Sequence, residues 1–223
     1  MKVFTHLRCF IFNAFNWNIW LAGFLLRDDL KGEKKYGINT AGLDELGGLE
    51  KNGVDITNNS IYTPVSFYLL EKTLSEIPVK YRNHFLDMGC GMGRAMCVAA
   101  HYGFKKVTGI DFSEPLCKTA IKNLSKTQQN ISPFVCNIIY NDAFYYEIPK
   151  DVDCLFFFNP FNDIIMNGVV NNVMKSLEQT PRDLYVIYVN PIYKELWTDE
   201  GFTEIYHTQK LKYLEASILR RKK

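Results

Sequence analysis

The sequence has little that would mark a metal centre or a disulfide framework. Its six cysteines form no CxxC pair, and its four histidines show no ligand spacing. We therefore expect reduced thiols and no metal ion. The charges also nearly cancel, because 26 Lys and Arg against 24 Asp and Glu leave a net charge of +2. Such a balance is not typical of a nucleic-acid-binding protein, although residues 220–223 form a basic cluster.

Internal repeats and low-complexity tracts are missing as well. The 223 residues, 47% of them hydrophobic, suffice for one globular domain with one further segment. The start of the chain has no clear small-x-small cleavage site, and free thiols argue against export. We therefore expect a cytoplasmic protein.

Residues 9–26 are an uncharged stretch of 18 residues. That is close to the length of a membrane span. However, Asn13, Asn16 and Asn18 interrupt the stretch, and aromatic residues alternate with them as on an amphipathic helix. Three interpretations stay open: a helix packed on the domain or on a partner, attachment to a membrane surface, and a spanning helix or signal. We favour the first.

The segment that follows carries no sustained apolar period. Residues 27–59 are rich in Gly, Asp, Lys and Asn, which predicts an irregular connector with room for one short helix. We therefore expect an N-terminal helical or irregular extension over residues 1–59. A helix should then begin with Thr63 as its cap and Pro64 as its first residue. Apolar side chains at spacings of 3, 4 and 3 predict one buried face on that helix. These side chains are Phe67, Leu70, Leu74 and Ile77.

Strand and helix patterns alternate through the rest of the chain. Nearly continuous apolar runs predict parallel strands that are covered on both faces. They are residues 84–88, 106–110, 134–139, 154–158 and 184–189, with helices expected over 93–102, 114–124 and 163–177. Residues 202–209 and 212–220 lie on either side of a short polar turn and predict a hairpin. The sequence therefore predicts an α/β domain over residues 60–223.

A glycine turn follows the first of these strands, in the sequence DMGCGMGR over residues 87–94. The turn lacks the lysine of a triphosphate-binding loop, and Arg94 stands where the dinucleotide fingerprint needs a third small residue. Asp87, at the end of the strand, would repel a pyrophosphate and attract an ammonium group. We therefore expect this turn to bind the positively charged amino acid end of a ligand.

Carboxylates also end the next two predicted strands. Asp111 lies 22 residues after Gly89 (111 − 89), where nucleoside-binding βαβ units carry an acidic residue for the ribose hydroxyls. Phe112 offers a face on which a purine could stack, and Asp142 could accept a hydrogen bond from an exocyclic amine. Acidic residues also end strands because they form turns. Together, however, the three carboxylates mark the crevice where such folds bind ligands.

The motifs DMGCGMG, VTGIDFS and NDAF, in this order and spacing, resemble motifs I, II and III of class I S-adenosylmethionine-dependent methyltransferases. The resemblance covers about residues 62–219. It implies a Rossmann-like sheet of seven strands, mostly parallel, with the hairpin as its antiparallel end, and S-adenosylmethionine as cofactor. Asp87 and the turn would hold the methionine part, Asp111 the ribose, and the next residues the adenine. The implied cofactor-binding residues are Asp87, Met88, Gly89, Cys90, Gly91, Asp111, Phe112, Asn141, Asp142 and Ala143.

The tripeptide of Asn159, Pro160 and Phe161 follows the fourth strand, where this family places the acceptor. It is similar to the (Asp/Asn/Ser)-Pro-Pro-(Tyr/Phe) motif of methyltransferases that act on amino nitrogens, with one proline in place of two. The resemblance implies that these residues hold the acceptor, and that Asn159 also contacts the cofactor. The alternative is an Asn-Pro step that only ends a strand. Tyr62 is a candidate lid residue or, equally, a side chain packed on the sheet edge.

We therefore expect a methyltransferase whose N-terminal extension covers the cofactor crevice or shapes the acceptor site. The acceptor would be a nitrogen on a small molecule, a sugar or a protein side chain. An RNA base is less favoured, because no separate basic and aromatic module is present. A non-catalytic S-adenosylmethionine-binding sensor or scaffold stays open as an alternative. An aminopropyltransferase is disfavoured, because no acid-rich pocket is evident after the fourth strand. Residues 9–26 are the expected site of any peripheral membrane or partner contact.

Overall fold

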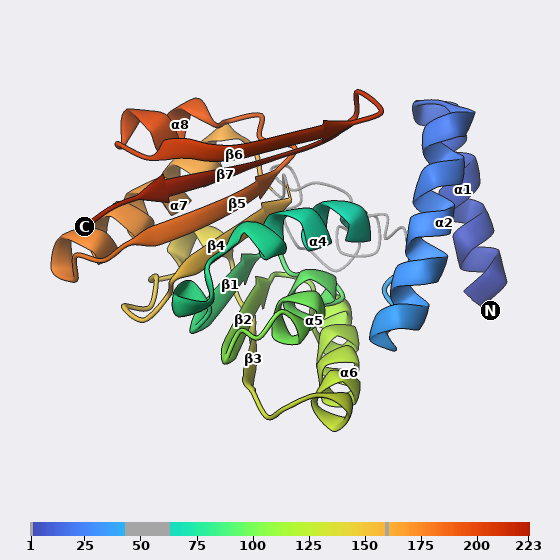
Figure 1. The fold of residues 1–223 in the computed structure, drawn as a ribbon, viewed down its shortest axis with the longest axis horizontal. Coiled ribbons are helices and arrows are strands. Elements are labelled where there is room, and N and C mark those ends of the chain that lie inside the picture. Colours follow the sequence, from blue (N-terminus) through green and yellow to red (C-terminus); the bar gives the residue numbers. More distant parts are fainter. Residues whose placement is uncertain (1, 43–62, 159–160) are drawn as a thin grey trace.

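The computed structural model describes residues 2–42, 63–158 and 161–223, built around a seven-stranded sheet in the order β3-β2-β1-β4-β5-β7-β6 (Figure 1). The strands are β1 (His84–Met88), β2 (Lys106–Asp111), β3 (Val135–Tyr140), β4 (Cys154–Phe158), β5 (Leu184–Val189), β6 (Thr203–Lys210) and β7 (Leu214–Arg221). The pairs among β1 to β5 are parallel, and β7 is antiparallel to both β5 and β6. The predicted α/β fold, with its Rossmann-like sheet and terminal hairpin, is confirmed.

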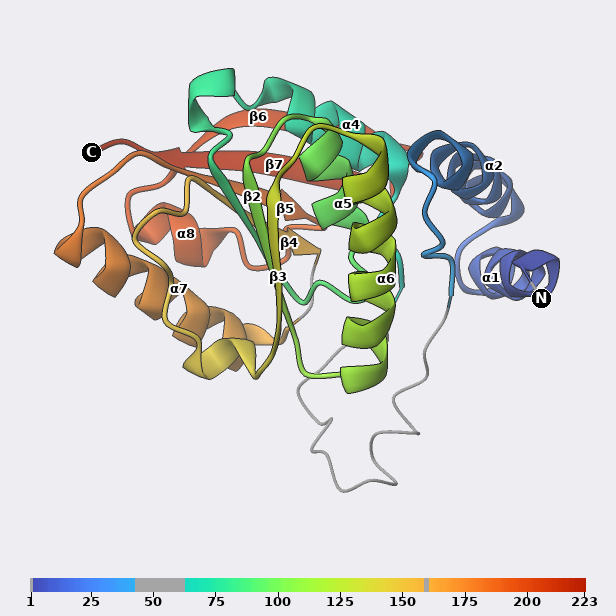
Figure 2. The same ribbon diagram turned by 90° about the horizontal axis from the view of Figure 1, so that it is seen from below.

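Helices cover both faces of the sheet (Figure 2). They are α4 (Phe67–Glu76), α5 (Arg94–His101), α6 (Glu114–Asn130), α7 (Asp163–Gln179) and α8 (Glu195–Asp199), with the 3-10 turns η1 (Val79–Tyr81) and η2 (Ala143–Tyr145). One hydrophobic cluster lies between the sheet and α4 and α5, and a second lies between the sheet and α7 and α8. The core therefore has two layers, one on each face.

The third strand differs from its prediction. β3 alternates exposed and half-buried residues, with Val135 56% exposed and Tyr140 61% exposed, so it is not covered on both faces. The physical reason is its place in the sheet: β3 pairs with β2 alone and forms one edge. An edge strand keeps an apolar composition while one side of it meets solvent.

The N-terminal extension is a helical hairpin of α1 (Lys2–Asn16) and α2 (Ile19–Tyr36). The uncharged stretch 9–26 is therefore not one helix. It breaks at Asn18, whose side-chain oxygen caps α2 by accepting a hydrogen bond from the backbone N–H of Leu21 at 2.8 Å. Across the described ranges, the helices are either too short or too polar to cross a bilayer.

Residues 27–36, predicted as irregular, are helical as well, up to the left-handed Gly37. The prediction failed because the buried face of this part of α2 carries the acidic residues Asp29 and Glu33 beside Gly32, with Tyr36 as its one large buried apolar side chain. No apolar period can form under those conditions. The proposed boundary between residues 59 and 60 lies outside the described residues.

The start of α4 was also predicted wrongly. The helix begins at Phe67, not at Pro64, and Ser66 caps it. Asp28 of α2 adds a second cap, because its carboxylate accepts hydrogen bonds from the Ser66 hydroxyl at 2.9 Å and from the Tyr68 N–H at 3.2 Å. A cap from another helix leaves no local sequence signal. The predicted buried face is confirmed by Phe67, Leu70, Leu74 and Ile77, none more than 1% exposed.

Gly32 of α2 packs directly against Phe67 of α4. A Cβ atom there would lie 2.2 Å from the ring of Phe67. We expect Gly32→Ala to lower the free energy of unfolding by about 1–3 kcal/mol through overpacking. Gly23→Ala is the matched control, because Gly23 is exposed on the same helix with no atom within 4 Å. It should be neutral, or raise the free energy of unfolding by up to about 1 kcal/mol. Equal values in denaturant titration would contradict this close packing.

Candidate functional site

The predicted carboxylates lie at one edge of the sheet. Asp87 is the penultimate residue of β1, Asp111 ends β2, and Asp142 follows β3 by two residues. The three strands are adjacent and parallel, with Asp87 opposite Gly109 in the register. Because parallel strands end at the same edge, these carboxylates lie along one edge of the sheet, where such folds bind ligands.

The glycine turn between β1 and α5 takes a conformation that requires glycine. Gly89, Gly91 and Gly93 have φ values of +88°, +51° and +79°. This left-handed region is costly for other residues. The turn therefore places its backbone close to the ends of β1 and β2 without side chains in the way.

Backbone donors of this turn are used inside the protein. The N–H groups of Gly89 and Cys90 both donate to the carbonyl of Ile110 at 2.9 Å. The Gly91 N–H donates to Oδ2 of Asp111 at 2.7 Å. A phosphate would need such N–H groups as donors, whereas an ammonium group needs acceptors. The geometry therefore suits a cationic ligand, in agreement with the exclusion of a phosphate loop from the sequence.

Asp87 is the electrostatic centre of the turn. It is only 2% exposed. Burial, and then the charge of Asp111, raise the pKa of the Asp87 carboxyl well above its usual value. Two carboxyl groups placed so close are stabilised by a bound cation. The ammonium group of an amino acid fits this position, so these residues fit S-adenosylmethionine.

Asp111 does more than the sequence predicted. One of its carboxylate oxygens holds the glycine turn through Gly91, and the other accepts a hydrogen bond from the Ser113 N–H at 2.9 Å. Its binding to a ribose stays a prediction. The sequence reasoning missed Gly109, where a Cβ atom would lie 2.7 Å from Sγ of Cys90. A glycine inside a strand is the signal that could have revealed this close approach.

The residues implied for adenine binding form a turn of their own. Oδ1 of Asn141 accepts a hydrogen bond from the Asp142 N–H at 2.8 Å, and Oδ1 of Asp142 accepts one from the Phe144 N–H at 2.9 Å, which caps η2. Ala143 is buried and Phe112 half-buried. Asn141 and Asp142 thus form and cap this turn, and their binding to adenine stays a prediction.

Two residues of the first motif are core residues. Met88 is fully buried in the cluster under α7, and Cys90 is 6% exposed in the cluster under α5. Burial, and then the charge of Asp111, raise the pKa of the Cys90 thiol well above its usual value, so the thiol stays neutral. Any contact of these two residues with a cofactor would therefore involve the backbone.

Comparison with known proteins identifies this arrangement. Residues 85–179 match a family model described as a methyltransferase domain. The chain therefore contains a methyltransferase domain, with the Rossmann-like fold that S-adenosylmethionine-dependent methyltransferases share. The buried carboxylate of Asp87 beside the glycine turn fits S-adenosylmethionine as the cofactor of such a domain. A search among curated proteins found no match.

Solved structures share the fold of this methyltransferase. A SAM-dependent methyltransferase from Aquifex aeolicus is 16% identical, with 68% of this chain and 88% of that chain covered and a TM-score of 0.53. An RNA methyltransferase from Salinibacter ruber, in complex with S-adenosyl-L-homocysteine, is 16% identical (71% and 92% covered, TM-score 0.52). A ribosomal protein L11 methylase from Lactobacillus delbrueckii subsp. bulgaricus is 15% identical (70% and 78%, TM-score 0.50). Different acceptors thus occur on one fold.

The predicted acceptor residues of the methyltransferase are only partly described. Tyr62, Asn159 and Pro160 lie outside the described residues. Phe161 is 6% exposed and packs in the hydrophobic cluster under α7. Its role at an acceptor stays a prediction.

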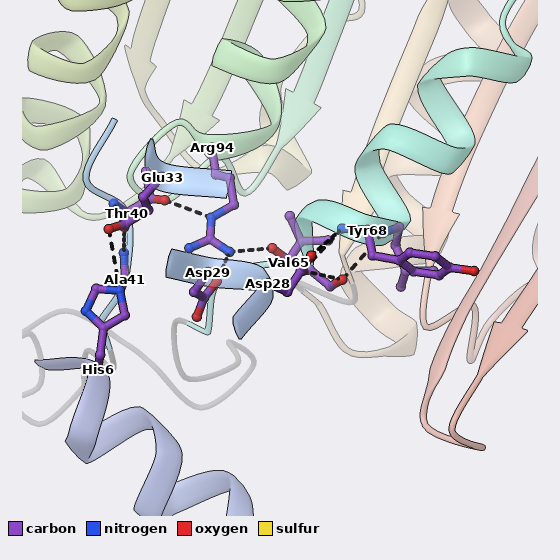
Figure 3. Close-up of polar contacts among 11 residues, drawn as sticks. His6, Asp28, Asp29, Glu33, Thr40, Ala41, Val65, Tyr68 and Arg94 are labelled. Atoms are coloured by element: carbon purple, nitrogen blue, oxygen red, sulfur yellow. Dashed lines mark hydrogen bonds and ion pairs between the residues drawn. The ribbon is translucent and has the colours of Figure 1, made fainter. Parts of the chain in front are cut away.

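Arg94, the first residue after the glycine turn, is buried instead of lying on the surface. It is 3% exposed and pairs with Asp29 of α2, with 2.6 Å between Nη1 and Oδ1 (Figure 3). The guanidinium also donates to the Thr40 hydroxyl and to the Val65 carbonyl, both at 2.7 Å, and lies 4.2 Å from the centre of the Phe67 ring. Arg94 is therefore a buried, salt-bridged residue of α5.

The segment after α2 is fixed by a second carboxylate. Oε1 of Glu33 accepts hydrogen bonds from the backbone N–H groups of Thr40 and Ala41, at 2.6 and 2.7 Å. Oε2 of Glu33 lies 3.5 Å from Nε2 of His6 on α1 (Figure 3). Both helices of the hairpin are thereby linked to the segment that contacts Arg94.

Asn123 of α6 joins this segment to the glycine turn. Its amide nitrogen donates to the carbonyl oxygens of Asn39 and Met92, at 3.1 and 3.0 Å, and its oxygen accepts a hydrogen bond from the Asn39 N–H at 3.1 Å. Asn123 is 3% exposed. The N-terminal extension is therefore linked to the glycine turn through Asn123 of α6.

Proposed function

We propose that this methyltransferase transfers a methyl group to a nitrogen atom of a small molecule, a sugar or a protein side chain. The observation that carries the proposal is the register of β4. Phe156 pairs with Asp87, so the chain leaves β4 at Phe158 beside the glycine turn. Asn159 is the next residue in the sequence. In this proposal the side chain of this residue contacts the acceptor.

The proposed division of labour follows from the chemistry of the side chains. Asp87 would hold the ammonium group of the cofactor, Asp111 the ribose, and the turn of Asn141, Asp142 and Ala143 the adenine. Bound there, S-adenosylmethionine supplies a methyl group already activated by its sulfonium charge. The chain has to align the acceptor and exclude water.

Asn159 would orient the acceptor in this scheme. Its carboxamide oxygen can accept a hydrogen bond from an acceptor N–H, which directs the nitrogen lone pair toward the methyl group. An amine acceptor needs no strong base, because its lone pair is available once it is neutral. The proposal therefore requires positioning groups and no catalytic histidine.

The test is a methyl-transfer assay with S-adenosylmethionine labelled on its methyl group and a lysate as the acceptor source. Label should enter small molecules or protein, and Asn159→Ala should slow transfer about a hundredfold. Asn130→Ala is the matched control, because Asn130 is exposed at the end of α6, and it should leave the rate unchanged. Label found only in RNA would contradict the proposed acceptor class. Cofactor binding without any transfer would favour the non-catalytic sensor.

A further inference from the structure

The outer face of α1 carries large apolar side chains at helical spacing. Its members are Phe4 (71% exposed), Leu7 (50%), Ile11 (45%) and Phe15 (87%). Spacings of 3, 4 and 4 place these side chains on one stripe of the helix. The opposite stripe, with His6 and Cys9, is buried. The apolar stripe therefore faces solvent, not the domain.

More apolar side chains gather where α1 turns into α2. They are Phe15 (87% exposed), Trp17 (46%), Ile19 (62%) and Trp20 (81%). Folded proteins rarely expose several large apolar side chains at one place, and such patches mark interaction sites. We call the α1 stripe and these turn residues the apolar surface of the hairpin.

The charges beside this apolar surface have one sign. Among residues 4–36, the exposed charged side chains are all basic: Arg8, Arg27, Lys31, Lys34 and Lys35. Asp29 and Glu33 are buried, and Asp28 is half-buried against the start of α4. The described part of the hairpin thus presents apolar and positively charged groups to solvent, and no exposed acid.

We propose that the α1–α2 hairpin binds the surface of anionic phospholipid membranes. Amphipathic helices that lie in a membrane interface combine Trp, Phe and Leu with Lys and Arg in this way. Indole and phenyl rings enter the headgroup region, and each basic residue near the surface is attracted to anionic lipids. This interaction surface lies outside the proposed methyl-transfer site. Membrane binding can therefore be tested independently of the proposed acceptor.

Two other occupants fit the hairpin less well. In an isologous dimer a second copy would bring the same basic side chains against their equivalents, without an exposed acid to neutralise them. A nucleic acid would neutralise the charges and stack on the aromatic rings, but the aliphatic side chains of Leu7, Ile11 and Ile19 would gain nothing from it. A lipid surface accommodates both kinds of group.

The β6–β7 turn lies next to the same end of the hairpin (Figure 1). The ammonium group of Lys210 is 4.5 Å from the centre of the Phe24 ring on α2. Leu211 and Tyr213, in that turn, are 43% and 46% exposed. Phe24 is one helical turn from Trp20, so the β6–β7 turn extends the proposed surface with two further apolar side chains.

Tryptophan fluorescence of the full chain tests the proposal directly. Of the three tryptophans, Trp197 is fully buried, while Trp17 and Trp20 are on the hairpin. Vesicles of phosphatidylcholine mixed with phosphatidylserine should shift the emission to shorter wavelength and protect it from acrylamide. Pure phosphatidylcholine vesicles should do so much less, and added salt should weaken the effect. An unchanged spectrum with both vesicle types would overturn the proposal.

Variants then locate the binding surface by cosedimentation with the mixed vesicles. Phe15→Ser with Trp20→Ser, and separately Lys31→Glu with Lys34→Glu, should each weaken binding at least about tenfold. Controls are Val79→Ser, exposed on η1, and Lys118→Glu with Lys122→Glu, exposed on α6; both should bind like the original chain. All variants should retain cofactor binding.

Two results would show a different occupant. One is a dimer that the Phe15→Ser and Trp20→Ser double variant dissociates, in a chain that binds no vesicles. The other is binding of RNA, also without vesicle binding. Equal vesicle binding by the hairpin and control variants would likewise overturn the proposal, because another surface would then be responsible.

Discussion

Replacing Arg94 with alanine is expected to lower the free energy of unfolding by about 3–5 kcal/mol. The guanidinium is 3% exposed and is the ion-pair partner of Asp29, whose side chain is 12% exposed. When the guanidinium is removed, the Asp29 carboxylate stays buried and unpaired, and the Val65 carbonyl loses its hydrogen-bond donor. Denaturant titration measures the loss. Arg94→Lys should be intermediate, because an ammonium keeps the charge but not the planar set of donors.

A double-mutant cycle separates the ion pair from general damage. If the pair is the cause, combining Arg94→Ala with Asp29→Ala costs less than the sum of the single changes. Arg220→Ala is the matched control: Arg220 also pairs with an aspartate, Asp183, at 2.7 Å, but both side chains are about one-fifth exposed. That change should cost about 1 kcal/mol or less. A cost at Arg94 no larger than that at Arg220 would show that burial of the pair does not matter.

The largest expected effect on the cofactor comes from Asp87→Asn, which should weaken S-adenosylmethionine binding about a hundredfold. The change removes a charge-assisted hydrogen bond to the ammonium group inside a buried site. Isothermal titration calorimetry gives the affinity. The control is Asp151→Asn, because Asp151 is a more exposed carboxylate that pairs with His84 and Lys106 at the opposite ends of β1 and β2. Equal affinities of the two variants would contradict the assigned role of Asp87.

Asp87 should also couple cofactor binding to pH. Burial and the nearby Asp111 raise its pKa in the free protein, and a bound ammonium would lower that pKa again. Between these two pKa values binding releases a proton, so affinity should rise with pH and level off above the pKa of the free protein. Calorimetry in buffers of different ionisation enthalpy detects the proton, and Asp87→Asn should abolish the effect. In the free protein the same raised pKa lowers stability as pH rises from 3.8 toward the folded value.

Local sequence patterns were sufficient to predict elements whose buried side chains are apolar and whose contacts lie close in the sequence. Strands β1, β4 and β5 were predicted with the bounds that the structure has. The grouping of Asp87, Asp111 and Asp142 at one edge of the sheet followed from the rule that parallel strands end at the same edge. By contrast, the second half of α2 was missed because its buried side chains include the acidic Asp29 and Glu33. Arg94, the ion-pair partner of Asp29, is 65 residues away. A bulky Arg94 after three glycines was the one visible sign of that contact.

The acceptor is less readable than the cofactor for a physical reason. Cofactor contacts come from strand ends whose spacing is set by the fold, so short sequence motifs at fixed spacing predict them. Acceptor contacts come from side chains on loops that vary within one fold. In this chain such signals were Tyr62 and the tripeptide after β4, of which Phe161 is a packed core residue.

The ion pair between α2 and α5 also has a consequence for the order of events on the ribosome. The hairpin is synthesised first, yet Asp29 cannot find Arg94 until 65 more residues have been added. At ordinary rates of translation that takes roughly 3–13 s, far longer than a helix needs to form. During this interval the apolar side chains of the nascent hairpin are exposed, and the sheet domain against which it packs has not yet been made. A growing chain could therefore reach a lipid surface before the catalytic domain exists, and fold there.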